Sequence, residues 1–287
     1  MGNDWVNREQ NMQTHPALCF VLRARLILCF LAVVLCLGCR KGGKEDVHYI
    51  RVGVVSGPEY VVAEAAQRVA KEKYGLTVEL IAFNDYIMPN TALFQKDIDV
   101  NVFQTRPFLE EQSAARGYHF AIIGPTFVYP MAAYSRKIKN LSELEEGSTI
   151  AIPNDATNEG RALLLLEKAG LIKLKPGRGY APRLIDIEEN RLKLNIFELE
   201  APQLPRALDD RQVSLAVINN SFAVKAGLYL GDGVIVEDKD SPYVNLIVAR
   251  EDNKDEDKVK RFARSYQSEE VIAAARKEFR EGAIPGW

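Results

Sequence analysis

One arginine stands where it could bind an anion. In the segment 151–170 a predicted strand runs into a polar turn and then into an apolar helix. Thr157 or Asn158 is a suitable N-cap for this helix, which places Arg161 in its first turn. A cation there opposes the helix dipole by about 0.3–1 kcal/mol. The placement is explained if backbone N–H groups and the guanidinium together bind a carboxylate at the helix end.

A second interpretation of Arg161 needs no ligand. The side chain would form an ion pair with Asp155 or Glu159 at the protein surface. Such exposed pairs contribute only about 0–1 kcal/mol to stability. The local pattern alone leaves both interpretations open.

Aromatic side chains follow two predicted strands in the first half of the chain. Phe83 and Tyr86 come after a strand at 76–82, and Phe103 ends a strand at 98–103. In open α/β sheets, ligands bind beyond the carboxyl ends of the strands. We therefore expect these rings to line a cleft, and packing in an ordinary hydrophobic core is the alternative.

Asparagine side chains form a third group. Asn219 and Asn220 follow a strand predicted at 214–218, and Asn245 lies inside one predicted at 243–249. Asparagine is depleted in strand interiors, so its presence there indicates a polar role. An edge position or a turn is the alternative.

The four cysteines all lie within the first 39 residues. Arg23 and Arg25 precede an apolar run at 26–37, which is followed by Gly38 and Cys39. This order is typical of a secretory signal that ends at a lipoprotein cleavage site. The run is too short to span a bilayer, which needs about 20 apolar residues. We expect Cys39 to become the lipidated first residue of the mature protein.

This interpretation divides the chain into three parts. Residues 1–38 form the signal peptide, whose start is Met1 or Met12, and residues 39–48 form a lipidated tether. The rest is a soluble body, anchored by lipid to the cell membrane and facing the periplasm or the exterior. A plain cleaved signal and an uncleaved anchor are the alternatives.

Composition argues against several classes of function for the body. Residues 39–287 contain 34 Lys and Arg and 37 Asp and Glu, a net charge of −3, which offers no footprint for nucleic acid. Because no cysteine follows Cys39, we predict no disulfide and no thiol nucleophile. His119 is the only histidine beyond the tether, which argues against a Ser-His-Asp triad or a histidine metal site. We predict no catalytic residue, no metal and no cofactor.

Alternating strands and helices predict an α/β fold. The first unit has strands at 49–55, 76–82, 98–103 and 119–123, with helices at 59–74, 90–95 and 107–116. The second unit has strands at 149–153, 195–199, 214–218 and 233–236, with helices at 158–169, 202–209 and 222–226. A strand at 243–249 and helices at 255–266 and 269–279 then return to the first unit.

Two extended segments, near 127–134 and 242–249, connect these units. We therefore predict two lobes, joined by two crossing strands that form a hinge beside a cleft. Lobe 1 comprises 49–127 plus 246–287, and lobe 2 comprises 128–245.

Six stretches of the body carry a family resemblance. They are 83–90 (FNDYIMPN), 98–107 (IDVNVFQTRP), 151–166 (AIPNDATNEGRALLLL), 199–210 (LEAPQLPRALDD), 216–220 (AVINN) and 241–245 (SPYVN). In these stretches the chain resembles the NlpA/MetQ-type substrate-binding lipoproteins of methionine ABC transporters. The resemblance covers nearly the whole mature chain. It implies a two-lobed periplasmic-binding-protein fold, type II-like, in agreement with the predicted hinge.

The resemblance implies roles for the polar residues at the head group of an amino acid. Arg161 is expected to bind the ligand carboxylate. Asn158, Asn219 and Asn245 are expected to hold the carboxylate and the α-amino group.

The resemblance also implies roles for the aromatic residues at the ligand side chain. Tyr86 and Phe103, together with Phe83, are expected to enclose it. A thioether makes favourable contacts with aromatic rings, of about 0.3–1.5 kcal/mol each. At Thr105 the family commonly has histidine, next to this side-chain pocket. Thr105 is smaller and uncharged, so side-chain selectivity can differ here.

The resemblance implies a binding protein rather than an enzyme. It would capture L-methionine in the cleft, close over it by a hinge motion, and deliver it to the permease and ATPase of an ABC importer. One alternative is the same fold with Gly-Met dipeptide, D-methionine or another amino acid as ligand. Alternatives from other classes are an enzyme in the cleft and a surface interaction or adhesin lipoprotein.

Overall fold

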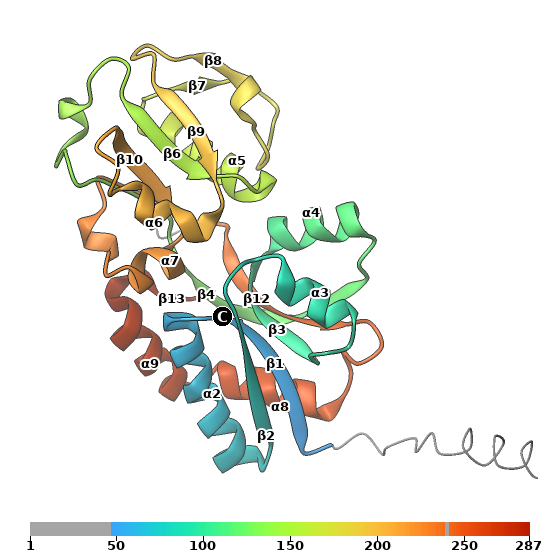
Figure 1. Cartoon of the computed structure of the whole chain (residues 1–287). Coiled ribbons are helices and arrows are strands. Elements are labelled where there is room, and N and C mark those ends of the chain that lie inside the picture. The colour runs from blue at the N-terminus through green and yellow to red at the C-terminus, as the bar shows by residue number, and fades with distance from the viewer. Residues whose placement is uncertain (1–46, 239–240) are drawn as a thin grey trace, which may run out of the picture. The chain divides into compact units, whose positions relative to one another are not determined.

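The computed structural model describes residues 47–238 and 241–287. The predicted signal peptide 1–38, the lipidation site Cys39 and most of the predicted tether lie outside the described residues. The described residues contain two large β-sheets, each packed against helices (Figure 1).

The first sheet has the strand order β13-β4-β12-β3-β1-β2. Its strands are β1 (Tyr49–Val55), β2 (Thr77–Phe83), β3 (Val100–Thr105), β4 (Phe120–Val128), β12 (Val244–Arg250) and β13 (Ile284–Pro285). β1 is parallel to β2 and β3, whereas β12 is antiparallel to β3 and β4. Ile50, Val52, Val54 and Val55 of β1 are fully buried, as expected for a strand that is covered on both faces.

Helices pack on both faces of this sheet. One face carries α2 (Pro58–Tyr74), α8 (Asp257–Tyr266) and α9 (Glu269–Phe279), and the other carries α3 (Met88–Phe94) and α4 (Arg106–Arg116). As predicted, the two C-terminal helices return to the first unit. Their apolar side chains Val259, Phe262, Val271 and Phe279 are fully buried in its core.

The second sheet has the strand order β11-β5-β10-β6-β9. Its strands are β5 (Ala132–Tyr134), β6 (Thr149–Pro153), β9 (Asn195–Leu199), β10 (Val213–Ile218) and β11 (Ile235–Val236). β6 is parallel to β9 and β10, and β5 is antiparallel to β10 and β11. One face packs against α5 (Ala156–Lys168), and the other against α6 (Leu204–Ala207) and α7 (Asn220–Lys225).

Several short elements complete the fold. A two-stranded ribbon pairs β7 (Lys173–Leu174) with β8 (Ile187–Glu189). Short 3-10 helices lie at Leu141–Glu143, Leu184–Asp186, Ala201–Gln203, Leu230–Asp232 and Arg280–Gly282. The ribbon and β13 were not predicted, because strands of two or three residues are too short to show an alternating pattern.

The chain passes twice between the two sheets. It leaves the first sheet at Val128 and enters the second at Ala132, and it returns between Val236 and Val244. β4 runs further than predicted, and β12 begins at Val244. Asn245 therefore lies in the first sheet, whereas the predicted boundary assigned it to lobe 2.

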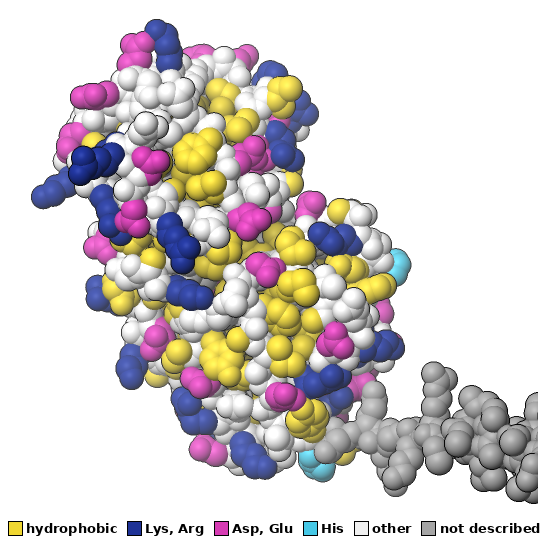
Figure 2. Space-filling view, in the orientation of Figure 1, with side chains coloured by type: hydrophobic (Ala, Val, Ile, Leu, Met, Phe, Trp, Pro, Cys, Tyr) yellow, Lys and Arg dark blue, Asp and Glu magenta, His cyan; other side chains and the backbone are white. Residues whose placement is uncertain are grey.

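Charged side chains of both signs are interspersed on the face shown in Figure 2. This mixture agrees with the near-neutral composition and differs from the basic groove that a phosphate backbone requires. Within residues 47–238 and 241–287, no helix is both long enough and apolar enough to cross a bilayer.

A buried network of amides fixes the end of β3. Asn90 of α3 donates from Nδ2 to Gln104 Oε1 at 2.8 Å. Its Oδ1 accepts from Asn101 Nδ2 at 2.9 Å and from Gln104 Nε2 at 2.8 Å. None of the three side chains is more than 2% exposed. The network therefore ties α3 to the strand that carries Phe103 and Thr105.

We expect Asn90→Ala to destabilise the protein by about 2–5 kcal/mol, because two buried amides lose their partners at about 1–3 kcal/mol each. Urea denaturation followed by circular dichroism measures the loss. The matched control is Asn195→Ala, since Asn195 is exposed and donates only to the Gly147 carbonyl at 2.8 Å. The control should lose less than about 1 kcal/mol, and equal losses in both variants would contradict the role of the network.

Candidate functional site

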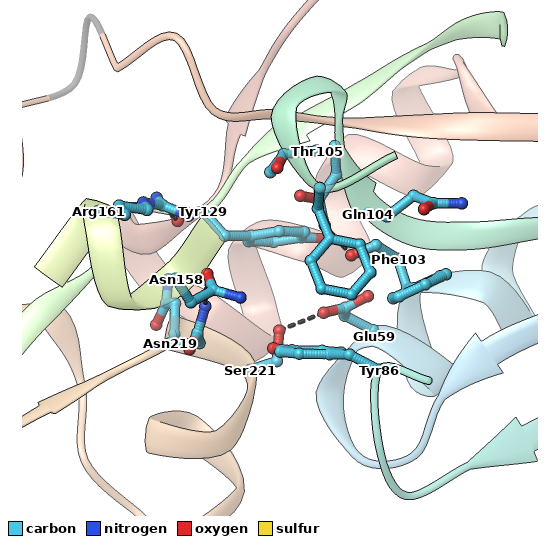
Figure 3. Close-up of a pocket in the computed structure, with 13 residues that line it drawn as sticks. Glu59, Tyr86, Phe103, Gln104, Thr105, Tyr129, Asn158, Arg161, Asn219 and Ser221 are labelled. Atoms are coloured by element: carbon cyan, nitrogen blue, oxygen red, sulfur yellow. Dashed lines mark hydrogen bonds between the residues drawn. The ribbon is translucent and has the colours of Figure 1, made fainter. Parts of the chain in front are cut away.

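A pocket lies between the two sheets, beyond the carboxyl ends of β1, β3, β6 and β10 (Figure 3). About 390 Å³ of space there is not filled by protein atoms, and part of it is open to solvent. Its lining residues are Glu59, Tyr86, Phe103, Gln104, Thr105, Phe108, Tyr129, Asn158, Arg161, Asn219, Asn220, Ser221 and Asn245. All the residues predicted to bind ligand are among them except Phe83.

Arg161 is held in a buried ion pair. Its Nε donates to Glu237 Oε1 at 3.0 Å, and its Nη2 donates to Glu237 Oε2 at 2.5 Å. Nη2 also donates to the carbonyl oxygen of Tyr129 at 3.0 Å, and the guanidinium carbon lies 4.3 Å from the centre of the Tyr243 ring. The side chain of Arg161 is 5% exposed. This two-point pairing balances the buried charge and fixes the plane of the guanidinium.

The predicted start of the helix that carries Arg161 is wrong by two or three residues. The N-cap is Asp155 rather than Thr157 or Asn158, and its Oδ1 accepts from the Asn158 backbone N–H at 2.9 Å. α5 therefore begins at Ala156, which places Arg161 in the second turn. The helix dipole acts mainly within the first turn, so it does not explain this position.

The predicted alternative, an ion pair with a neighbour in the same turn, is also not formed. Asp155 caps the helix, and Glu159 pairs with Arg183 instead. The carboxylate that balances Arg161 belongs to Glu237, which lies 76 positions further along the chain.

The ion pair leaves one end of the guanidinium available. Nε and Nη2 are bonded to protein oxygens, whereas Nη1 of Arg161 has no hydrogen-bond partner among the described residues. An anion in the pocket can therefore bind at Nη1 without displacing Glu237.

The asparagine side chains form a chain of hydrogen bonds. Asn219 Nδ2 donates to Asn158 Oδ1 at 2.8 Å, and Asn158 Nδ2 donates to the two Asp155 carboxylate oxygens at 2.9 and 3.0 Å. Figure 3 shows Asn158 and Asn219 side by side at one end of the pocket. Asn245 Nδ2 donates to the Phe103 carbonyl at 3.0 Å. Burial raises the pKa of Asp155, and the bonds from Asn158 act in the opposite direction.

Aromatic rings form the other side of the pocket. Tyr86 stacks on Phe103 with ring centres 5.9 Å apart, and it contacts Phe222 at 5.0 Å and Phe108 at 6.1 Å. Phe222 belongs to α7, so this cluster joins the two lobes. Burial raises the pKa of Tyr86, so its phenol stays neutral.

Phe83 does not belong to this cluster, which corrects the prediction. Side chains alternate between the two faces of a sheet. In β2, Val78 and Leu80 therefore face α2, whereas Ile81 and Phe83 face α3. Phe83 packs there with Ile98, away from the pocket.

Thr105 lies at the carboxyl end of β3, opposite Asn245 of β12. It is 8% exposed and lines the pocket. Its neutral hydroxyl group adds no charge to this part of the wall.

The sequence analysis missed Glu59, which lies in the first turn of α2. Its carboxylate is 3% exposed and hydrogen-bonds to the Ser221 hydroxyl of α7 (Figure 3). Burial raises the pKa of Glu59 to about 8, while the bond with Ser221 acts in the opposite direction. The rule that ligands bind beyond strand ends applies to β1 as well, and it could have identified this residue.

Tyr129 was also missed, together with Gln104, Phe108 and Ser221, whereas Asn220 was noted after its strand but given no role at the ligand. Tyr129 follows β4 in the first crossing, and burial raises the pKa of its phenol. Nothing in the local sequence distinguishes these side chains from core residues. They can be recognised as pocket residues only from the way the two lobes pack together.

The pocket thus combines a fixed cation, several amides and a wall of aromatic rings. This arrangement suits a small molecule with a carboxylate at one end and an apolar tail. Among residues 47–238 and 241–287, no group of three or more His, Cys, Asp and Glu side chains could hold a metal ion.

Comparison with known proteins gives consistent matches. The profile described as NlpA lipoprotein matches residues 50–287. Over 251 residues the chain is 59% identical to the D-methionine-binding lipoprotein MetQ of Salmonella typhimurium, a match that covers 87% of this chain and 92% of the relative.

Solved structures agree with these matches. The crystal structure of the methionine-binding protein MetQ superposes with a TM-score of 0.83 at 59% identity, covering 84% of this chain and 99% of that one. A nutrient-binding protein from Burkholderia cenocepacia bound to methionine gives 0.81 at 45% identity, covering 83% and 100%. These similarities confirm the family resemblance and the two-lobed α/β fold predicted from the sequence.

Proposed function

Because this chain belongs to the NlpA lipoprotein family, we propose that it is a lipid-anchored binding protein that captures methionine and delivers it to an ABC importer. The main support for the proposal is the way in which the Arg161 guanidinium is held. Glu237 fixes its guanidinium, and Nη1 is left to bind a carboxylate in a pocket walled by aromatic rings. A relative named as a D-methionine-binding lipoprotein and a structural neighbour bound to methionine support this choice of ligand.

A methionine zwitterion is complementary to both ends of the pocket. Its carboxylate accepts a charge-assisted hydrogen bond from Arg161. Its thioether lies against Tyr86 and Phe103, where each sulfur–ring contact contributes about 0.3–1.5 kcal/mol. Thr105, in place of the histidine common in the family, keeps that wall neutral.

Delivery requires partners beyond this chain. The two crossings, one at 129–131 and one that includes 237–238 and 241–243, serve as the hinge about which the lobes close on the ligand. The closed form then docks on a membrane permease, whose ATPase drives import. The lipid on Cys39 holds the protein at the outer surface of the membrane. The relatives are named as binding proteins rather than enzymes, and this role involves no turnover.

Experiment can distinguish L-methionine from D-methionine as the ligand. We assign L-methionine to this chain, whereas the Salmonella relative is named for D-methionine. The two differ in the direction in which the side chain leaves the α-carbon, so both cannot satisfy the polar and aromatic ends equally well. Gly-Met dipeptide is the further candidate, because it ends in the same carboxylate and thioether.

We expect soluble protein from residue 40 onward to carry methionine when it is purified. Native mass spectrometry identifies the co-purified molecule. After unfolding and refolding to remove it, calorimetric titration with L-methionine, D-methionine and Gly-Met ranks the ligands. Tight binding of L-methionine supports the proposal, and failure of all three ligands to bind would refute it.

We expect Arg161→Ala to weaken methionine binding by about 2–5 kcal/mol, which is roughly 30- to several-thousand-fold, because the ligand carboxylate loses its charged partner. The same calorimetric titration measures the change.

Two controls separate binding from folding in this test. Arg161→Ala leaves Glu237 as an unpaired buried charge, so Arg161→Ala combined with Glu237→Ala should fold better than the single variant and still bind weakly. Unchanged affinity in either folded protein would rule out Arg161 as the carboxylate partner.

We expect Cys39→Ser in the full-length chain to release the protein from membranes and to leave methionine affinity unchanged. The reason is that lipid attachment needs the cysteine thiol, while the pocket is built from residues after 58. Membrane fractionation and titration of the released protein measure the two effects. If the variant stays in the membrane fraction, an uncleaved anchor holds it there instead.

A further inference from the structure

Glu59 lies in the pocket without a cationic partner among the described residues. Among the described residues its side chain hydrogen-bonds only to the Ser221 hydroxyl, and in Figure 3 it lies across the pocket from Arg161. Burying a carboxylate without a counter-charge is unfavourable, so such a residue calls for a functional explanation.

Unpartnered oxygen atoms of three further residues line the pocket together with Glu59. Asn219 Oδ1, Asn220 Oδ1 and the Tyr129 hydroxyl are buried, line the pocket, and have no hydrogen-bond partner among the described residues. Each unsatisfied buried polar atom costs about 1–3 kcal/mol unless a ligand satisfies it. These oxygens can accept hydrogen bonds from a donor-rich group of a ligand in the pocket.

The orientation of the asparagines follows from their other bonds. Asn219 Nδ2 is committed to Asn158 Oδ1 at 2.8 Å, because the Asn158 amide nitrogen is itself held by Asp155. Asn220 Nδ2 is committed to the Gly282 carbonyl at 2.7 Å. Both side chains must therefore present their oxygens as the unpartnered atoms.

We propose that Glu59 is the counter-charge of the ligand's α-ammonium group, which it binds together with the neighbouring amide and phenol oxygens. This assignment rests on the function proposed above and adds the residue that recognises the amino group. An ammonium has three donors and no acceptor, so it matches a carboxylate surrounded by acceptors. Arg161 and Glu59 then bind the two charged groups on the α-carbon of the ligand and set its orientation.

The groups around Glu59 come from several elements, and those facing it are neutral. Tyr86 follows β2, Tyr129 follows β4, and Tyr266 belongs to α8; their phenols are all buried. Lys225 of α7 lies one turn beyond Ser221, and its ammonium donates to the Ser56 hydroxyl at 2.7 Å. The ligand is therefore the cation available to Glu59 inside the pocket.

Ligand capture is consequently coupled to a proton. In the empty pocket burial holds the pKa of Glu59 at about 8, so the carboxyl group is mostly protonated at pH 7. A bound ammonium favours the ionised form and lowers that pKa. Binding should therefore release most of one proton at pH 7, and affinity should rise with pH below the raised pKa of Glu59.

The test measures proton release by the wild-type soluble protein directly. Titrations with the established best methionine enantiomer in buffers of different ionisation enthalpy give the number of protons released. Release close to the expected value, with tighter binding at higher pH, supports the assignment. Tight binding without proton release would overturn the Glu59 assignment and leave the proposed function intact. No methionine binding at any pH would overturn both.

Glu59→Gln keeps the shape of the side chain and its ability to bond to Ser221. We expect this variant to release no proton, to lose the pH dependence, and to bind methionine about 10- to 100-fold more weakly at pH 7.5. Glu72→Gln makes the same change at an exposed position on α2 and should behave like wild type.

A ligand that lacks the amino group provides a second readout. Wild-type protein should bind 4-(methylthio)butanoate at least about 30-fold more weakly than methionine, because Glu59 then has no cation to bind. In Glu59→Gln this ratio should shrink severalfold. An unchanged ratio would show that Glu59 does not contact the amino group, whatever its effect on stability.

Discussion

The bidentate ion pair of Arg161 with Glu237 is the interaction on which the site depends. A buried guanidinium must be neutralised, yet some of its donors must remain available for an anion. Glu237 meets both needs, and it also accepts the Met131 backbone N–H at 3.1 Å. Glu237 lies in the returning crossing, while Met131 and Tyr129 lie in the outgoing one. Arg161 of the second lobe is thus bonded to both connections between the lobes.

The aromatic side of the pocket is part of a hydrophobic core that both lobes share. Val55, Phe103 and Phe108 of the first lobe pack in one cluster with Tyr134 and Phe222 of the second. Separating the lobes would expose these rings to water, so burial of apolar surface favours the packed arrangement of the lobes. A ligand with an apolar tail adds to that burial, whereas the polar end alone determines how the ligand is oriented.

Sequence patterns predicted the helices and strands, which depend on neighbouring residues. They did not predict contacts between segments that are far apart in the chain. The helices and most strands were predicted because their hydrophobic periods are local, and Arg161 was found because it follows a strand and turn. The partners Glu237 and Ser221 could not be predicted: 76 positions separate Arg161 from Glu237, and 162 separate Glu59 from Ser221. Phe83 was predicted to line the cleft, but its position in β2 directs its side chain to the face that packs on α3. The sequence around the following turn does not show to which face of the sheet this residue points.

The position of β12 in the first sheet has a consequence for how the chain is made and exported. β12 lies between β3 and β4, so that sheet stays open in its middle until residues 244–250 have been synthesised. The second sheet, in contrast, uses strands from the continuous stretch 132–236. Since domains tend to fold as their residues emerge, the second lobe can form first. The sheet of the first lobe is completed only when β12 joins it, after all the strands of the second sheet have been made.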